Sequence, residues 1–146
     1  MKVLLATKKP FVSKAVSEIQ HIIETAGHQF DKIEKYTEKS QLLDAIKDAD
    51  AVIVRSDIID REVIDAAPRL KLIVRAGAGY DNVDLNAATE RDICVMNTPG
   101  QNANAVAELV FGMLIYVLRN YVDGSTGTEL KGKRLGLYAF GNVAKM

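Results

Sequence analysis

The sequence predicts an α/β fold, a flavodoxin-like parallel sheet of five strands wound by helices. Short apolar runs rich in β-branched residues recur along the first hundred residues or so, each with the length of a buried strand. Between them, apolar residues repeat every three or four positions, which is typical of helices. Because parallel neighbours need a crossover connection, this alternation favours a doubly wound sheet. The five expected strands are Val3–Ala6, Phe30–Tyr36, Ala51–Val54, Leu72–Val74 and Ile93–Met96.

The first two expected helices follow the first two strands. Pro10 suits the first turn of the first helix, and Gly27 suits the left-handed residue after its end. Thr37 is a candidate N-cap for the second helix. The residues expected to face inward are Ala15, Val16, Ile19, Ile22, Ile23 and Ala26 in the first helix, and Leu42, Leu43, Ala45 and Ile46 in the second.

Two aspartates mark the starts of two shorter helices. Asp60 precedes a helix with Val63, Ile64 and Ala67 inward, which ends at Pro68. Asp84 precedes a helix through Leu85, Ala87 and Ala88, which leads to the fifth strand. Two strands joined in this way lie side by side, and the turns that follow them open on one edge of the sheet.

Composition and charge indicate an ordinary globular domain. Of 146 residues, 48% are hydrophobic and 26% charged, with 19 basic and 19 acidic residues. This balance lacks the basic excess of a nucleic-acid binder. The single cysteine, Cys94, lies in an apolar run and is expected to be buried. The apolar residues after Met1–Lys2 are too few for a signal sequence, so we expect a cytoplasmic protein.

Residues 105–118 form an unusual helix, apolar on all sides, with Glu108 as the only charge. At 1.5 Å per residue it would extend about 21 Å, too short for a membrane span. We therefore expect it to be covered by another domain or another chain. The expected divisions are a domain over 1–101, an interdomain or dimer helix over 102–121, and a linker with the start of a second domain over 122–146.

A glycine turn follows the fourth strand, at Arg75-Ala76-Gly77-Ala78-Gly79. Glycines that accept positive φ let a turn curl tightly and direct its N–H groups toward one anion. Arg55-Ser56 closes the third strand, expected to be adjacent. An arginine, a hydroxyl and main-chain N–H groups together can hold a carboxylate. A structural turn without a ligand is the alternative interpretation.

Two ordered blocks, RAGAGYDNVDLNAA and MNTPGQNANAVAEL, resemble the D-isomer-specific 2-hydroxyacid dehydrogenases over nearly the whole chain. The resemblance implies NAD-dependent oxidation of a small 2-hydroxy acid, free or phosphorylated, by a homodimer. It implies substrate contacts from the main chain of Ala76, Gly77, Ala78 and Gly79. It also implies substrate contacts from Arg55, Ser56 and Asn102. For Asn102 the alternative is a turn or cap residue, and Arg75 is expected to brace the loop.

The resemblance places the cofactor near Ala78 and Gly141. Residues 135–140 are expected to form the first strand of a nucleotide-binding domain, followed by a glycine turn. The dinucleotide fingerprint asks for three glycines, and only the middle one, Gly141, is present; Ala139 stands in place of the first.

No residue of 1–146 is assigned a catalytic role, and no cluster has metal-ligand spacing. His21 and His28 lie on or after the first helix and are expected at the surface. The resemblance places the catalytic histidine, its acidic partner and an arginine beyond these residues. A non-catalytic, corepressor-like binding module on the same scaffold is one alternative. A phosphoacceptor receiver domain is another, but it needs an acidic pair where Thr7-Lys8-Lys9 stands.

Overall fold

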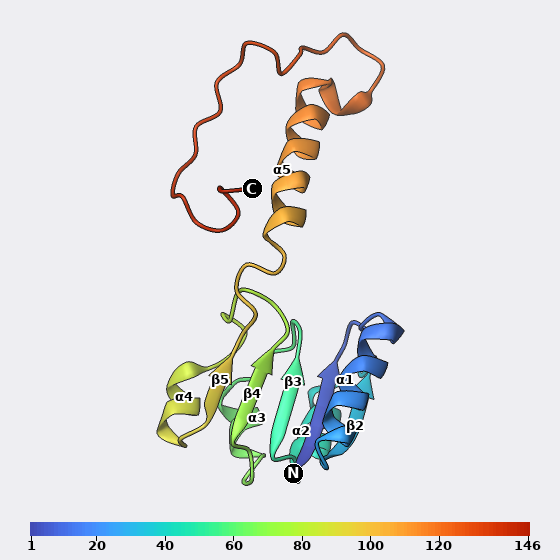
Figure 1. Ribbon diagram of the computed structural model, residues 1–146, viewed down its shortest axis with the longest axis vertical. Coiled ribbons are helices and arrows are strands. Elements are labelled where there is room, and N and C mark those ends of the chain that lie inside the picture. Colours follow the sequence, from blue (N-terminus) through green and yellow to red (C-terminus); the bar gives the residue numbers. More distant parts are fainter. The chain divides into compact units, whose positions relative to one another are not determined.

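The computed structural model describes residues 1–146 as two compact units, Met1–Thr98 and Pro99–Met146, and each is described by itself. The first unit contains a parallel sheet of five strands in the order β2-β1-β3-β4-β5, which is the flavodoxin-like order (Figure 1). The predicted fold class is confirmed. The elements in chain order are β1 (Lys2–Thr7), α1 (Ser13–Thr25), β2 (Gln29–Glu34), α2 (Lys39–Ile46), β3 (Ala51–Val54), α3 (Arg61–Asp65), β4 (Leu72–Arg75), α4 (Leu85–Glu90) and β5 (Cys94–Met96).

The main core lies on one face of the sheet. Alternate residues of β1, β3 and β4, represented by Leu4, Val52 and Ile73, point to this face and are almost fully buried. Helices α2, α3 and α4 supply the opposing apolar side chains, including Ile46 and Ile64. This buried layer fixes the strands whose carboxyl ends carry the candidate site.

The opposite face is less completely covered, and this corrects the prediction for Cys94. Helix α1 lies over the β1–β2 side of the sheet (Figure 1). Cys94 pairs with Leu72 across β4 and β5, so the two side chains share the face that α1 leaves open. Cys94 is exposed as a result, and Met96 on the same face is 53% exposed.

Two of the N-cap residues predicted from the sequence cap their helices in the structure. Asp60 accepts a hydrogen bond from Val63 N–H, and Asp84 accepts one from Ala87 N–H. Thr37 was the wrong cap for α2, because Glu38 and Gln41 form a reciprocal capping box one residue later.

Helix α1 differs from its prediction at both its start and its inward face. Pro10 lies before the helix, since Thr7 Oγ1 donates to the carbonyl of Lys9 and keeps this segment in a turn. Ile22 in α1 and Ala26 just after it are exposed, whereas Val16 is buried. Gly27 has the expected positive φ, 77°.

The second unit contains α5 (Ala103–Leu118) and a 3₁₀ turn, η1 (Asn120–Val122). Residues 135–140, predicted to be a strand, have no regular secondary structure. A strand needs a hydrogen-bonded neighbour, and no strand within this unit offers one. None of the helices combines the length and apolar character needed to cross a bilayer.

Candidate carboxylate-binding site

The structure brings the two predicted loops together. β3 and β4 are hydrogen-bonded parallel neighbours, with Val54 paired to Arg75. The Arg55–Ser56 loop and the glycine turn therefore leave the same edge of the sheet, one strand apart (Figure 1). Arg55 and Ser56 are exposed, so their side chains are accessible to a ligand.

The main-chain donors of the turn divide into two pairs. The N–H of Ala76 already donates to the carbonyl of Val54, at 2.7 Å, and the N–H of Gly77 donates to the carbonyl of Arg75, at 2.8 Å. Those of Ala78 and Gly79 have no partner within the protein. In this structure Ala78 and Gly79 are therefore the donors available to an anion.

The glycines of the turn do not adopt positive φ; the lack of a side chain at Gly77 instead leaves space for a neighbouring side chain. Neither Gly77 nor Gly79 has a positive φ, unlike Gly27 and Gly100. The guanidinium group of Arg75 instead lies where a side chain on Gly77 would begin. Arg75 thus packs over the turn, as the sequence predicted for a bracing residue.

The end of β5 braces the same turn, a contact that the sequence did not predict. Asn97 Nδ2 donates to the carbonyl of Ala78 at 2.7 Å, and Thr98 N–H donates to the carbonyl of Gly77 at 2.9 Å. With these carbonyls held, the peptide planes that carry the N–H groups of Ala78 and Gly79 have a fixed orientation. A polar residue directly after an apolar run was the only signal for Asn97.

Unpaired cations collect at this edge. Lys8 and Lys9 follow β1, Lys35 follows β2, Arg55 follows β3, and Arg75 ends β4. None of the five forms an ion pair, whereas eight other lysines and arginines of the first unit do. Five cations without an ion-pair partner therefore stand at this edge, together with the carboxylates of Asp57 and Asp81, although the chain as a whole has no net charge. Cations that are free in this way can attract an anion.

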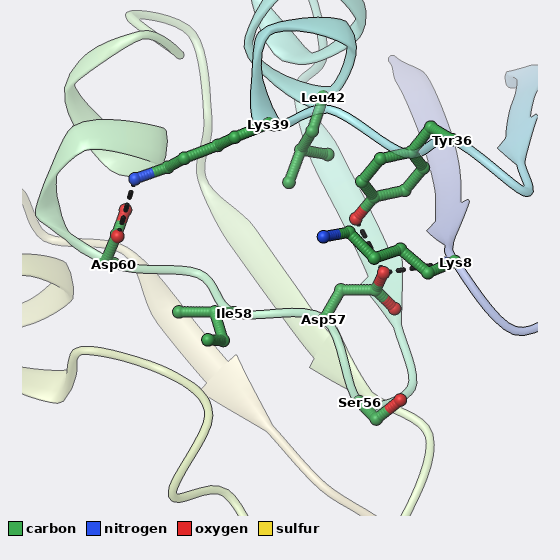
Figure 2. Close-up of a pocket in the computed structure, with 8 residues that line it drawn as sticks. All are labelled: Lys8, Tyr36, Lys39, Leu42, Ser56, Asp57, Ile58 and Asp60. Carbon is green, nitrogen blue, oxygen red and sulfur yellow. Dashed lines mark hydrogen bonds and ion pairs between the residues drawn. The ribbon is translucent and has the colours of Figure 1, made fainter.

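A small cavity lies beside Ser56. Its volume is about 230 Å³, and its walls include Lys8, Tyr36 and Asp57 (Figure 2). Burial raises the pKa of the Tyr36 hydroxyl, and its hydrogen bond to Asp57 raises that pKa further. On the far wall, Lys39 pairs with Asp60 at 2.7 Å, so the Lys39 charge is largely compensated.

Asn102 and Gly141 belong to the second unit, and their site roles stay predictions. Asn102 stands at the N-cap position of α5, but its side chain makes no capping bond and is exposed. Ala139 has a φ of 74°, a conformation that favours glycine, so the place where the fingerprint asks for its first glycine has glycine-like backbone. Residues 139–146 form only a turn and do not by themselves build a dinucleotide site.

The fold and this edge define a class, a parallel α/β domain with a candidate anion site at the carboxyl ends of its strands. The chain belongs to the D-isomer-specific 2-hydroxyacid dehydrogenases, because the model of that family's catalytic domain matches residues 7–146. It is a family of oxidoreductases.

Known relatives place the similarity within this family. D-3-phosphoglycerate dehydrogenase of Methanocaldococcus jannaschii is 40% identical over 121 residues, which are 73% of this chain and 23% of that protein. Hydroxypyruvate reductase of Thermotoga maritima is 37% identical over 125 residues, which are 76% of this chain and 41% of that protein.

A solved structure is similar over almost the whole chain. The crystal structure of NAD⁺-bound 3-phosphoglycerate dehydrogenase from Entamoeba histolytica has a TM-score of 0.95 and 52% identity, covering 99% of this chain and 48% of that one. The chain spans less than half the length of each of these three relatives.

Proposed function

We propose that this chain is the substrate-binding part of an NAD-dependent D-2-hydroxyacid dehydrogenase. The adjacency of Arg55–Ser56 and the glycine turn on neighbouring parallel strands is the observation that carries the proposal. The guanidinium of Arg55 and the free N–H groups of Ala78 and Gly79 would hold the substrate carboxylate, with the hydroxyl of Ser56 beside them. Asn102 would complete the substrate contacts.

The substrate we propose is 3-phosphoglycerate, whose oxidation opens serine biosynthesis. Its phosphate adds about 1.5 to 2 further negative charges at neutral pH. The unpaired Lys8, Lys9 and Lys35 lie at the same edge as Arg55. The similarity to proteins named phosphoglycerate dehydrogenase supports the same choice. A monoanionic hydroxy acid would leave this group of cations without a partner.

The cofactor we propose is NAD, as in the similar structure from Entamoeba histolytica. Within this chain, the main chain of Ala78 and of Gly141 would contribute to its binding. When bound, the cofactor would accept the hydride.

The chain by itself should bind substrate without oxidising it. Hydride removal from a hydroxy acid needs a base for the hydroxyl proton. His28 lies just before β2, at the amino edge of the sheet, and His21 lies on the second half of α1. Neither histidine is at the edge where the candidate site lies, so neither is placed to act as that base.

Binding and turnover can be measured separately. We would titrate ¹⁵N-labelled chain with 3-phosphoglycerate and with D-glycerate, using an Arg55→Ala variant as the control. We expect shifts at residues 55–56 and 78–79, tighter binding of 3-phosphoglycerate, and loss of both effects in the variant. With NAD added, no NADH should form. Shifts confined to other residues would refute the proposed site, and steady NADH production would refute the proposed division of roles.

A further inference from the structure

Asp57 follows Arg55 and Ser56 directly and is a buried carboxylate, only 4% exposed. Its Oδ1 accepts a hydrogen bond from Tyr36 Oη at 2.6 Å and another from Lys8 N–H at 2.7 Å. Figure 2 shows both donors converging on this one oxygen. Because Lys8 follows β1 and Tyr36 follows β2, Asp57 ties the loop after β3 to the loops of two other strands.

The same segment is tied to the chain that follows the glycine turn. Asn82 Nδ2 donates to the carbonyl of Asp57 at 2.7 Å, and Ile59 N–H donates to the carbonyl of Asn82 at 2.8 Å. Asp84 N–H then donates to the carbonyl of Ile59 at 2.9 Å. Asp57 and Ile59 are therefore fixed relative to residues 82–84, a segment that begins three residues beyond Gly79.

Packing alone does not hold the Arg55–Ser56 loop. Arg55 and Ser56 are exposed, and Ile58 is 66% exposed. Beside them lies the cavity of about 230 Å³, which leaves room for the loop to move inward. The bonds to Asp57 are charge-assisted, and hydrogen bonds of that kind are roughly twice as strong as neutral ones. Together with the bonds to residues 82–84, they restrain this loop.

The second carboxylate oxygen, Oδ2, is buried and has no partner. Leaving such an acceptor unpaired costs about 1–3 kcal/mol, and unpaired buried groups in native proteins call for an explanation. An apolar residue at position 57 would avoid that cost but would lose both ties through Oδ1. The ties are therefore the property of Asp57 that offsets the cost.

We propose that Asp57 is a positioning residue, which holds Arg55 and Ser56 at the spacing from Ala78 and Gly79 at which one carboxylate contacts both loops. Asp57 itself does not touch the ligand. The inference rests on the proposed function, because that function supplies the carboxylate.

Asp50 offers a matched control at the other end of the same strand. Asp50 lies directly before β3, whereas Asp57 lies shortly after the end of β3. Asp50 is also buried, with 8% of its surface exposed. Its Oδ2 accepts from Lys2 N–H at 2.6 Å, so it ties β1 to β3 at the amino edge. Asp50→Asn and Asp57→Asn both remove a carboxylate charge and weaken a bond from a main-chain N–H of β1 or the residue after it. Asp50→Asn also breaks the ion pair with Arg69, so it is the more disruptive change, but only Asp57 adjoins the candidate site.

The test measures affinity for 3-phosphoglycerate and amide resonances in the two variants. We expect Asp57→Asn to weaken binding roughly tenfold, because a small misplacement of a binding group has effects of this size or larger. Asp50→Asn should bind within about twofold of the unsubstituted chain, although it should lose at least as much thermal stability. Removing a negative charge near the site would by itself tighten anion binding, so weaker binding in Asp57→Asn cannot be an effect of charge.

A second readout needs no ligand. In Asp57→Asn the amide resonances of Arg55 and Ser56 should shift and broaden, and in Asp50→Asn they should not. Tyr36→Phe removes one tie and no charge, so it should weaken binding in the same direction by a smaller factor. If Asp57→Asn does not fold, the affinity and amide resonances of Tyr36→Phe provide the test instead.

The outcomes separate the two proposals. An unsubstituted chain that fails to bind 3-phosphoglycerate overturns the proposed function, while the ligand-free resonances still decide whether Asp57 orders the loop. A chain that binds equally well with and without Asp57 overturns the positioning role alone. Equal losses of affinity in Asp50→Asn and Asp57→Asn would also overturn it, since they would indicate a general loss of stability.

Discussion

The glycine at position 77 provides a direct test of how the turn is built. In Gly77→Ala the added methyl group would occupy the position of the Arg75 guanidinium, which must move. Arg75 Nε has no hydrogen-bond partner, so its displacement breaks no bond there. What is lost is packing, at about 0.1–0.2 kcal/mol per pair of atoms in contact. Against this, replacing glycine by alanine at ordinary φ stabilises by about 0.4–1 kcal/mol through the unfolded state.

These two effects nearly cancel, so Gly77→Ala should keep its free energy of unfolding within about 1 kcal/mol of the unsubstituted chain. The control is Gly27→Ala, where φ is 77° and no atom lies within 4 Å of the new methyl group. That change should cost about 1–2 kcal/mol through backbone strain alone. Urea unfolding followed by far-ultraviolet circular dichroism measures both. If Gly77→Ala lost more than Gly27→Ala, the turn would need glycine for its backbone, and our reasoning about Arg75 would be refuted.

Three further predictions concern stability and assembly. Asp84→Ala should lower the free energy of unfolding by about 1 kcal/mol, because the N-cap bond to Ala87 N–H is lost; Asp84→Asn, which can still accept, should lose less in the same urea titration. The hydrogen bond from Lys2 N–H, and then Arg69, hold the pKa of Asp50 below its usual range. The carboxylate of Asp50 therefore contributes stability above about pH 4, and this contribution is lost as the pH falls further. In thermal melts, the melting temperature of Asp50→Asn should fall less steeply with decreasing pH than that of the unsubstituted chain. Half of the Phe111 side chain on α5 is exposed, so we propose that α5 packs against a second copy of the chain. Sedimentation should then show that the unsubstituted chain is a dimer and that Phe111→Glu is a monomer. The control Tyr138→Phe, at another exposed site, should remain a dimer. A monomeric unsubstituted chain would contradict this proposal.

Much of the first unit was predictable because its signals are local. The run at residues 51–54 is apolar and β-branched, and it forms a strand with the predicted bounds. Asp60 and Asp84 cap helices because a short acceptor beside the first helical N–H groups acts within a few residues. The alternation of elements predicted a parallel sheet, but strand order depends on which strands pair, and the order came only from the structure.

Two of the errors share a physical origin, since each depends on what lies beside the residue in space. Cys94 sits in an apolar run, but its exposure depends on whether a helix covers that part of the sheet. Residues 135–140 have a strand-like composition but no neighbouring strand. For Thr37 the cue was local, and the Glu38–Gln41 pair competed successfully one residue later.

In the candidate site, too, some features could be predicted from the sequence and others depend on contacts between distant residues. The adjacency of Arg55 and the glycine turn followed from two consecutive strands, and the structure agrees. The bond between Tyr36 and Asp57 joins residues 21 positions apart, and no spacing rule points to it. The bond from Asn97 to the carbonyl of Ala78 likewise depends on how two loops lie across neighbouring strands.

The two aspartates that flank β3 also bear on folding fidelity. Asp50 accepts a hydrogen bond from the N–H of Lys2, and Asp57 accepts one from the N–H of Lys8, so both ends of β1 are held in register with β3. If β1 slipped by one residue, both carboxylates would lose their partners at once, and the buried side chains of β1 would turn to the wrong face. These polar bonds therefore select one alignment among apolar strands that could otherwise pair in several.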